Sequence, residues 1–195
     1  DNECMVVMMK ERELDVFFKK YNMTPKLVVT DSQIFLKAAA SVPKGIPLTS
    51  FSILFARMKG DFNMFIEGTR QISKLHENDN VLILESCSHH VTGDDIGRVK
   101  IPRCLSNFTG LKLNYDVVAG FNQAPKEISE YRLIVQCGGC MLTRKQLINR
   151  IKPGVDNVIP ITNYGMAIAY CHGIFEQAIE PFLGIKNEER HLDYL

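Results

Sequence analysis

The sequence predicts an α/β fold in which short apolar strands alternate with helices around a mostly parallel sheet. The first observation is the alternation itself: apolar runs of strand length are followed by segments whose apolar side chains recur at helical spacing. The second is composition, because the 195-residue chain is 46% apolar and 23% charged, which is typical of a globular protein with its own core. We therefore expect a three-layer domain with helices on both faces of its sheet, preceded by a smaller α/β segment.

The smaller segment is expected to occupy residues 1–48. Its apolar pattern predicts a β-α-β-α order, and in the first helix Leu14, Phe17, Phe18 and Tyr21 fall on one face. Such a small unit cannot cover a sheet on both faces, so it should complete a domain begun upstream or pack against another chain. A linker of Pro43, Gly45 and Pro47 follows. The four elements are Cys4–Met9, Glu11–Tyr21, Lys26–Val29 and a helix capped by Thr30 or Asp31 that runs to about Ala40.

Residues 49–195 are expected to form the larger domain. Asp94–Leu105 is predicted to be a short helical or irregular segment, because Gly97 and Pro102 interrupt it. The predicted helices are Ser50–Lys59, a helix capped by Asp61 that runs through Leu75, Thr143–Ile151 and Asn163–Ile179. The predicted strands are Val81–Leu84, Leu113–Val118, Arg132–Val135 and Val158–Ile161.

Charge and cysteine content exclude several classes of protein. A net charge of +1 does not favour binding to nucleic acid or to a membrane surface. Apolar runs stay well short of the ~18 residues that a transmembrane helix needs. Six cysteines in a chain that can build its own core indicate a reducing, cytoplasmic compartment with the clustered cysteines used for metal. Because the sequence begins with Asp1 instead of Met, we expect a fragment or a processed product.

Two cysteine groups follow two of the predicted strands. Cys87 and the histidines His89 and His90 come after Val81–Leu84, and the pair Cys137 and Cys140 comes after Leu133–Val135. Sites in open α/β sheets form at the carboxyl ends of parallel strands. The two groups should therefore meet at one edge of the sheet, where we predict a metal site.

The spacing leaves three chemistries open for this site. The pair Cys137-x-x-Cys140 by itself is consistent with a redox dithiol, half of a zinc site, part of an iron–sulfur site, or simply two cysteines in a tight turn. With a histidine, three thiolates make a structural Cys3His zinc site; with a non-cysteine fourth position they make a [4Fe-4S] site. Gly138 and Gly139 allow the backbone to wrap close to such a centre. Cys4 and Cys171 are interpreted as structural, and the role of Cys104 is left open.

These motifs and their surroundings resemble the [FeFe]-hydrogenase maturation GTPase family (HydF). In that family Cys-x-His is followed, about fifty residues later, by His-Cys-x-x-Cys; Gln136 here stands in place of the frequent histidine. The resemblance covers most of the chain but not the family's GTPase domain, since the sequence has no G-x-x-x-x-G-K-[ST] loop. Enzymatic activity is therefore not assigned to this chain. The matching stretches are Val28–Gln33, Cys87–His89, Asp94–Arg103, Cys137–Leu142 and Pro160–Gly165.

The resemblance implies a scaffold and carrier. Cys87, Cys137 and Cys140 would bind a [4Fe-4S] cluster, and the protein would hold a two-iron subcluster precursor and deliver it to apo-[FeFe]-hydrogenase. Implied partners are a second copy of the chain, bound through residues 1 to about 45, the radical-SAM hydrogenase maturases and the immature hydrogenase. No nucleic acid and no membrane are implied.

Further residues near the cysteines are candidates for this role. The fourth ligand of the cluster would be His89, His90, Asp94, Asp95 or water, and an equally weighted alternative makes Asp94 a helix cap. The basic run of Arg98, Lys100 and Arg103 is either a solvated face or an anchor for an anionic precursor or partner. Asn163 and Tyr164 should line the same sheet edge and donate hydrogen bonds to cluster sulfurs.

Overall fold

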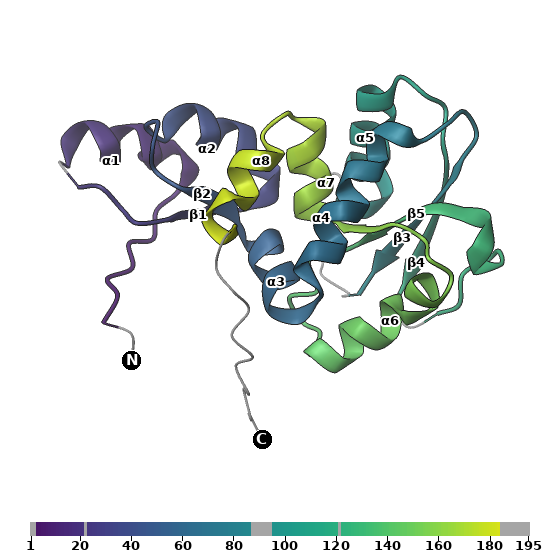
Figure 1. The fold of residues 1–195 in the computed structure, drawn as a ribbon. Helices are drawn as coiled ribbons and strands as arrows, with labels where there is room; N and C mark the ends of the chain where they lie inside the picture. The colour runs from purple at the N-terminus through teal and green to yellow at the C-terminus, as the bar shows by residue number, and fades with distance from the viewer. Residues whose placement is uncertain (1–2, 22, 87–94, 121, 184–195) are drawn as a thin grey trace.

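The computed structural model describes residues 3–21, 23–86, 95–120 and 122–183 (Figure 1). Within these ranges the chain forms a two-stranded and a four-stranded sheet, both entirely parallel, with helices packed around them. The predicted α/β class with mostly parallel sheets is therefore confirmed. No helix in the described ranges is both long enough and apolar enough to cross a membrane.

The N-terminal segment contains the small sheet. Asp31 caps the second helical region, as predicted, by accepting a hydrogen bond of 2.7 Å from the Gln33 N–H. Strand β2 was missed by the sequence analysis; it pairs with β1 in register from Val28–Leu48 to Thr30–Ser50. The elements are the 3-10 turn η1 (Glu11–Glu13), α1 (Leu14–Lys20), β1 (Val28–Thr30), η2 (Ser32–Ile34), α2 (Phe35–Ser41) and β2 (Leu48–Ser50).

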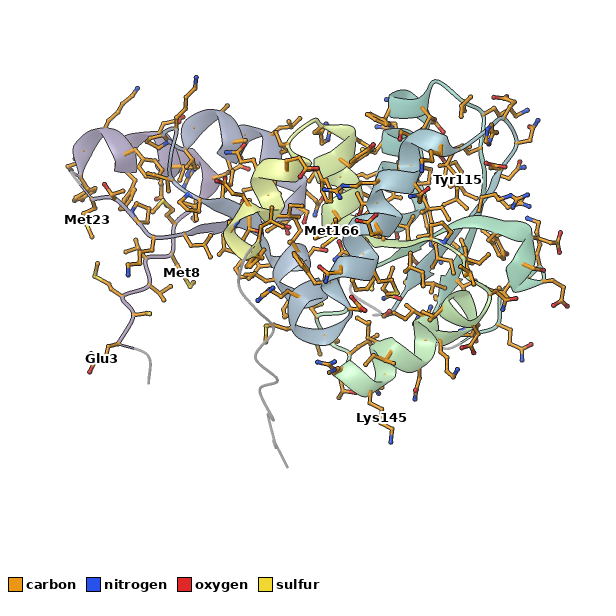
Figure 2. All side chains as sticks on the ribbon, in the orientation of Figure 1. Glu3, Met8, Met23, Tyr115, Lys145 and Met166 are labelled. Atoms are coloured by element: carbon orange, nitrogen blue, oxygen red, sulfur yellow. The ribbon has the colours of Figure 1, made fainter. Side chains whose placement is uncertain are left out.

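The strand predicted at Cys4–Met9 is wrong. This stretch is extended without pairing to a strand of the described chain, and it lies away from the core, with Val6 78% and Met8 90% exposed. Figure 2 shows Met8 on the outside of the molecule. The apolar composition that suggested a buried strand therefore leaves an exposed apolar surface in the single chain.

The large sheet has the strand order β4-β3-β5-β6. Its strands are β3 (Asn80–Glu85), β4 (Asn114–Ala119), β5 (Tyr131–Gln136) and β6 (Ile161–Asn163). The first three match the prediction to within two residues. The fourth begins three residues later than predicted, because Val158 has a φ of +56° and is 87% exposed, so the chain turns there before it enters the sheet.

Helices cover both faces of this sheet, which makes the three layers. On one face Leu82 and Ile134 pack with Leu147 of α6 (Arg144–Asp156), in a core that continues into the N-terminal segment. On the other face Ile83 and Val135 pack with α5 (Ile101–Thr109) and α7 (Tyr164–Cys171). Figure 1 shows α5 and α6 on opposite sides of the strands.

The two helices that precede the sheet begin and end as predicted. Ser50 caps α3 (Phe51–Lys59), Gly60 ends it, and Asp61 caps α4 (Phe62–Arg70), which continues as the 3-10 turn η3 (Gln71–Lys74). Helix α4 packs very closely against strand β6, since a Cβ built on Gly68 would lie 1.9 Å from the Ile161 carbonyl oxygen.

Two helical predictions needed correction. Residues from Ile96 form one continuous helical stretch, the π-helical turn η4 (Ile96–Lys100) followed by α5, and Pro102 lies in the first turn of α5, where its missing N–H costs nothing. The last predicted helix is two helices, because Gly173, with a φ of +71°, separates α7 from α8 (Phe175–Ile179), which leads into the 3-10 turn η6 (Glu180–Phe182). The remaining 3-10 turn, η5 (Ile128–Glu130), precedes β5.

Candidate metal centre

The two central strands of the large sheet define a topological switch point. From β3 the chain passes through α5 to β4, whereas from β5 it passes through α6 to β6, in the opposite direction and over the opposite face. In open α/β sheets ligands bind in the crevice that this reversal leaves at the carboxyl ends of the strands. Ser86 directly follows β3 and Cys137 directly follows β5, so the structure brings both ends of the candidate site to this crevice.

The Cys137 sulfur lies at the carboxyl ends of both strands and receives hydrogen bonds from each. The Ser86 backbone N–H donates to it at 3.2 Å and the Gln136 side-chain Nε2 at 3.4 Å. The Cys137 N–H in turn donates to the Leu84 carbonyl at 2.9 Å. Donors aimed at a sulfur stabilise its negatively charged form, which is the form that binds metal.

Gln136 is completely buried and connects the two chain segments. Its Nε2 also donates to the Ser86 hydroxyl at 2.6 Å, while its Oε1 has no hydrogen-bond partner among the described residues. An unsatisfied buried acceptor is costly, and such atoms are often found at functional sites. The signal in the sequence was a glutamine at the end of an otherwise apolar strand.

The Cys137–Cys140 turn is held by its glycines and by a lysine. Gly139 has a φ of +63°, which favours glycine, and a Cβ on Gly138 would lie 3.3 Å from the Ser52 hydroxyl. Lys59 Nζ donates to the carbonyl oxygens of Gly139 at 2.7 Å and Cys140 at 3.1 Å. Cys140 is exposed whereas Cys137 is buried, so the pair has one thiol facing solvent and one facing the sheet.

Arg150, on α6, supports the same sheet edge and was not singled out from the sequence. Its Nη2 donates to the carbonyl oxygens of Glu85 at 3.1 Å and Val118 at 2.8 Å. Burial lowers the pKa of Arg150, and the neighbouring Cys137, Tyr164 and Glu85 groups oppose this shift. A positive charge therefore lies close to the Cys137 sulfur and ties the ends of β3 and β4 together.

The predicted basic run is partly neutralised by carboxylates of the same chain. Arg98 lies 3.4 Å from a Glu85 oxygen and 3.9 Å from an Asp95 oxygen, and Asp95 also accepts a hydrogen bond from the Arg98 N–H at 2.8 Å. Burial, with the nearby Asp95 charge, raises the pKa of Glu85, while Arg98 acts in the opposite direction. Lys100 donates to the Gln33 side chain, which joins this run to the N-terminal segment.

Asn163 and Tyr164 lie at the carboxyl edge of the sheet, as predicted. Asn163 caps α7 by accepting a hydrogen bond from the Met166 N–H at 2.9 Å, and its Nδ2 donates to the Ser52 carbonyl at 2.7 Å. Tyr164 is buried beside η4: a Cβ on Gly97 would lie 2.2 Å from the Tyr164 hydroxyl. The structure therefore gives Asn163 a capping role; donation from either residue to cluster sulfurs remains a prediction.

The remaining predicted ligands, Cys87, His89, His90 and Asp94, lie outside the described residues. Among the residues that are described, no group of three or more His, Cys, Asp and Glu side chains is arranged to hold a metal ion. The described part of the site consists of Cys137, Cys140 and the groups around them.

Fold and site together define a class of protein: a three-layer parallel α/β domain with a Cys-x-x-Cys turn at its topological switch point, joined to a smaller α/β segment. A family model for the hydrogen maturase F tetramerization domain matches residues 63–181, and one for the hydrogen maturase F dimerization domain matches residues 1–60. The chain belongs to the hydrogen maturase F family, as the resemblance indicated. A search of curated proteins found no match.

Membership of this family connects the chain to hydrogenase maturation. Both matched models describe domains of self-association, so the chain consists largely of the parts through which the family forms oligomers. The GTPase domain is not among the matches.

Proposed function

We propose that the chain is an iron–sulfur scaffold and carrier, in which Cys87, Cys137 and Cys140 bind a [4Fe-4S] cluster at the carboxyl ends of β3 and β5. The observation that carries this proposal is the Ser86 N–H, which donates to the Cys137 sulfur across the switch point. Cys87 follows Ser86 directly in the sequence, and we propose that its thiol is the third cluster ligand.

The residues around Cys137 suit a thiolate-bound cluster. Backbone and amide donors to sulfur, a glycine turn and the charge of Arg150 all stabilise negative charge at this position. The accessible thiol of Cys140 would face a cluster from the solvent side. Three cysteine ligands leave one iron of a [4Fe-4S] cluster able to accept an exchangeable ligand, which is what a carrier requires.

The cargo would be the two-iron precursor of the hydrogenase active site. It would be released to apo-[FeFe]-hydrogenase, with the radical-SAM maturases as further partners. Arg98 is 59% exposed at its side chain, so it can bind an anionic precursor or an acidic surface, although Glu85 and Asp95 compensate part of its charge. We assign cluster binding to residues 49–195 and dimerisation to residues 1–48, where the exposed apolar stretch from Met5 to Met8 would pack on a second copy.

Anaerobic reconstitution with iron and sulfide tests cluster binding. Wild-type protein should turn brown and contain about four irons and four sulfides per chain, and Cys87→Ala should lose both. Cys4→Ala is the matched control, since Cys4 lies on the exposed N-terminal stretch, and it should bind like wild type. A colourless wild-type protein that holds stoichiometric zinc after reconstitution would overturn the proposal in favour of a structural zinc domain.

The fourth ligand is tested separately by electron paramagnetic resonance of the reduced cluster. We propose Asp94, because a carboxylate exchanges more readily than a thiolate. Asp94→Ala should change the spectrum while Cys87, Cys137 and Cys140 keep the cluster bound. The cap of η4 is Asp95, whose side chain accepts a hydrogen bond from the Arg98 N–H. An unchanged spectrum would therefore refute the role of Asp94 and move it to His89, His90, Asp95 or water.

A further inference from the structure

A second pair of thiols lies away from the candidate metal centre. Cys104 is on α5 and Cys171 ends α7, and their thiols lie close enough to shift each other's pKa. Both side chains are partly buried, so neither is sealed in the core. The sequence does not indicate this pairing, since 66 positions separate the two cysteines.

The two helices that carry these thiols are closely packed. Cα atoms of α5 and α7 approach within 8 Å, and one residue before Cys171 the Tyr170 ring meets Phe108 of α5 edge to face at 5.2 Å between centroids. The Tyr115 hydroxyl is hydrogen-bonded to the Ser106 hydroxyl at 2.9 Å and donates to the Pro102 carbonyl at 3.1 Å. Burial raises the pKa of Tyr115, and the hydroxyl lies close enough to both thiols for their charges to raise it further. Figure 2 shows Tyr115 beside α5.

The close packing of these helices favours a disulfide between the two thiols. Native disulfides join Cα atoms about 4.4–6.8 Å apart, and more distant pairs need backbone movement. Thiols that interact with each other on helices packed this closely need little movement to form a disulfide.

We propose that Cys104 and Cys171 are a redox-responsive dithiol, which a small-molecule disulfide such as oxidised glutathione converts into a disulfide joining α5 to α7.

The two thiols have different roles in this reaction. The hydrogen bond from Cys171 lowers the pKa of Cys104, whereas the same bond and burial raise the pKa of Cys171. We therefore expect Cys104 to attack first. It breaks the S–S bond of the reagent, forms a mixed disulfide and releases one thiol; Cys171 then loses its proton, attacks the Cys104 sulfur and releases the second thiol. The protein loses two electrons and the reagent gains them.

The disulfide would restrain the candidate metal centre from a distance. Helix α5 continues directly from η4, which carries Arg98, and α7 begins with Tyr164, against which Gly97 of η4 packs. A covalent link between α5 and α7 would therefore restrain Arg98 and Tyr164 relative to each other. The oxidation itself does not depend on whether a cluster is bound.

Peptide mapping of the full chain tests the proposal. Iron-free protein is incubated anaerobically with oxidised glutathione, its remaining thiols are alkylated, and it is digested with trypsin. Trypsin places Cys104 in residues 104–112 and Cys171 in residues 151–186, and each peptide contains a single cysteine. We expect these two peptides linked by a disulfide, and a dithiol reductant should separate them.

Single variants test the order of attack. Cys171→Ser should stop at a mixed disulfide of Cys104 with glutathione, whereas Cys104→Ser should leave Cys171 largely alkylated. The exposed Cys140, in residues 133–144, reports on whether the reagent was active. If wild-type Cys104 and Cys171 are both fully alkylated in a sample in which Cys140 has reacted, the proposal is wrong. Because iron is absent throughout, this result is independent of the outcome of the reconstitution experiment.

Discussion

Replacing Arg150 with methionine should destabilise the protein and loosen the end of β3. Methionine preserves most of the side-chain length but removes both hydrogen bonds to the carbonyl oxygens of Glu85 and Val118. A hydrogen bond to a charged group contributes about 1.5–3 kcal/mol. Because Arg150 is only partly buried, water can replace part of the lost hydrogen bonding. We therefore expect the free energy of unfolding to fall by about 2–4 kcal/mol for the two bonds.

Urea unfolding followed by circular dichroism, at a fixed protein concentration, measures this loss. The corresponding fall in Tm is about 4–16 °C for a chain of this size. Arg144→Met is the matched control, because Arg144 is exposed on the same helix and should change stability by less than about 0.5 kcal/mol. If Arg150→Met is no less stable than Arg144→Met, the two carbonyl contacts do not hold the sheet edge, and the account of Arg150 is wrong.

Three further changes test other parts of the structure. Gly68→Ala should lower the free energy of unfolding, measured in urea, by about 3 kcal/mol or more, since the added Cβ would lie 1.9 Å from the Ile161 carbonyl oxygen. An unfolding midpoint like that of wild type would contradict the close packing of α4 on β6. Burial and the bond to Asp116 raise the pKa of Tyr131 to about 12, so the stability that this hydroxyl supplies is complete below pH 10 and lost as the pH rises through about 12. The difference in unfolding free energy between wild type and Tyr131→Phe should therefore be constant up to pH 10 and shrink above it, and a difference that does not change with pH would refute this. Val6→Asp should raise the Kd for self-association at least about tenfold in sedimentation experiments, because burying a valine contributes about 1.5–3 kcal/mol to the free energy of association. An unchanged Kd would show that the N-terminal stretch is not in the interface.

Elements with strong local signals could be predicted from the sequence. The cap Asp61, the helix starts at Ser50 and Asn163 and the stop at Gly60 were placed correctly, because a helix end is satisfied within one turn of its own helix. The central strands were found because they are buried on both faces and are therefore apolar throughout. Strand β2 escaped detection because its Thr49 and Ser50 are polar, and both are buried by contacts distant in sequence, such as the 2.9 Å bond from Thr49 to the Ala178 carbonyl.

The sequence by itself determined the fold class, the family resemblance and the position of Cys137 at the carboxyl end of a parallel strand. These follow from local periodicity and from motif spacing, which do not depend on how the elements pack. Only the tertiary structure decided which distant groups lie near that sulfur: the Ser86 N–H donates to it from the end of β3, and the charge of Arg150 on α6 is close by. It also brought Cys104 against Cys171. Contacts between distant segments depend on strand order and helix packing, and neither is encoded in the residues that immediately flank a motif.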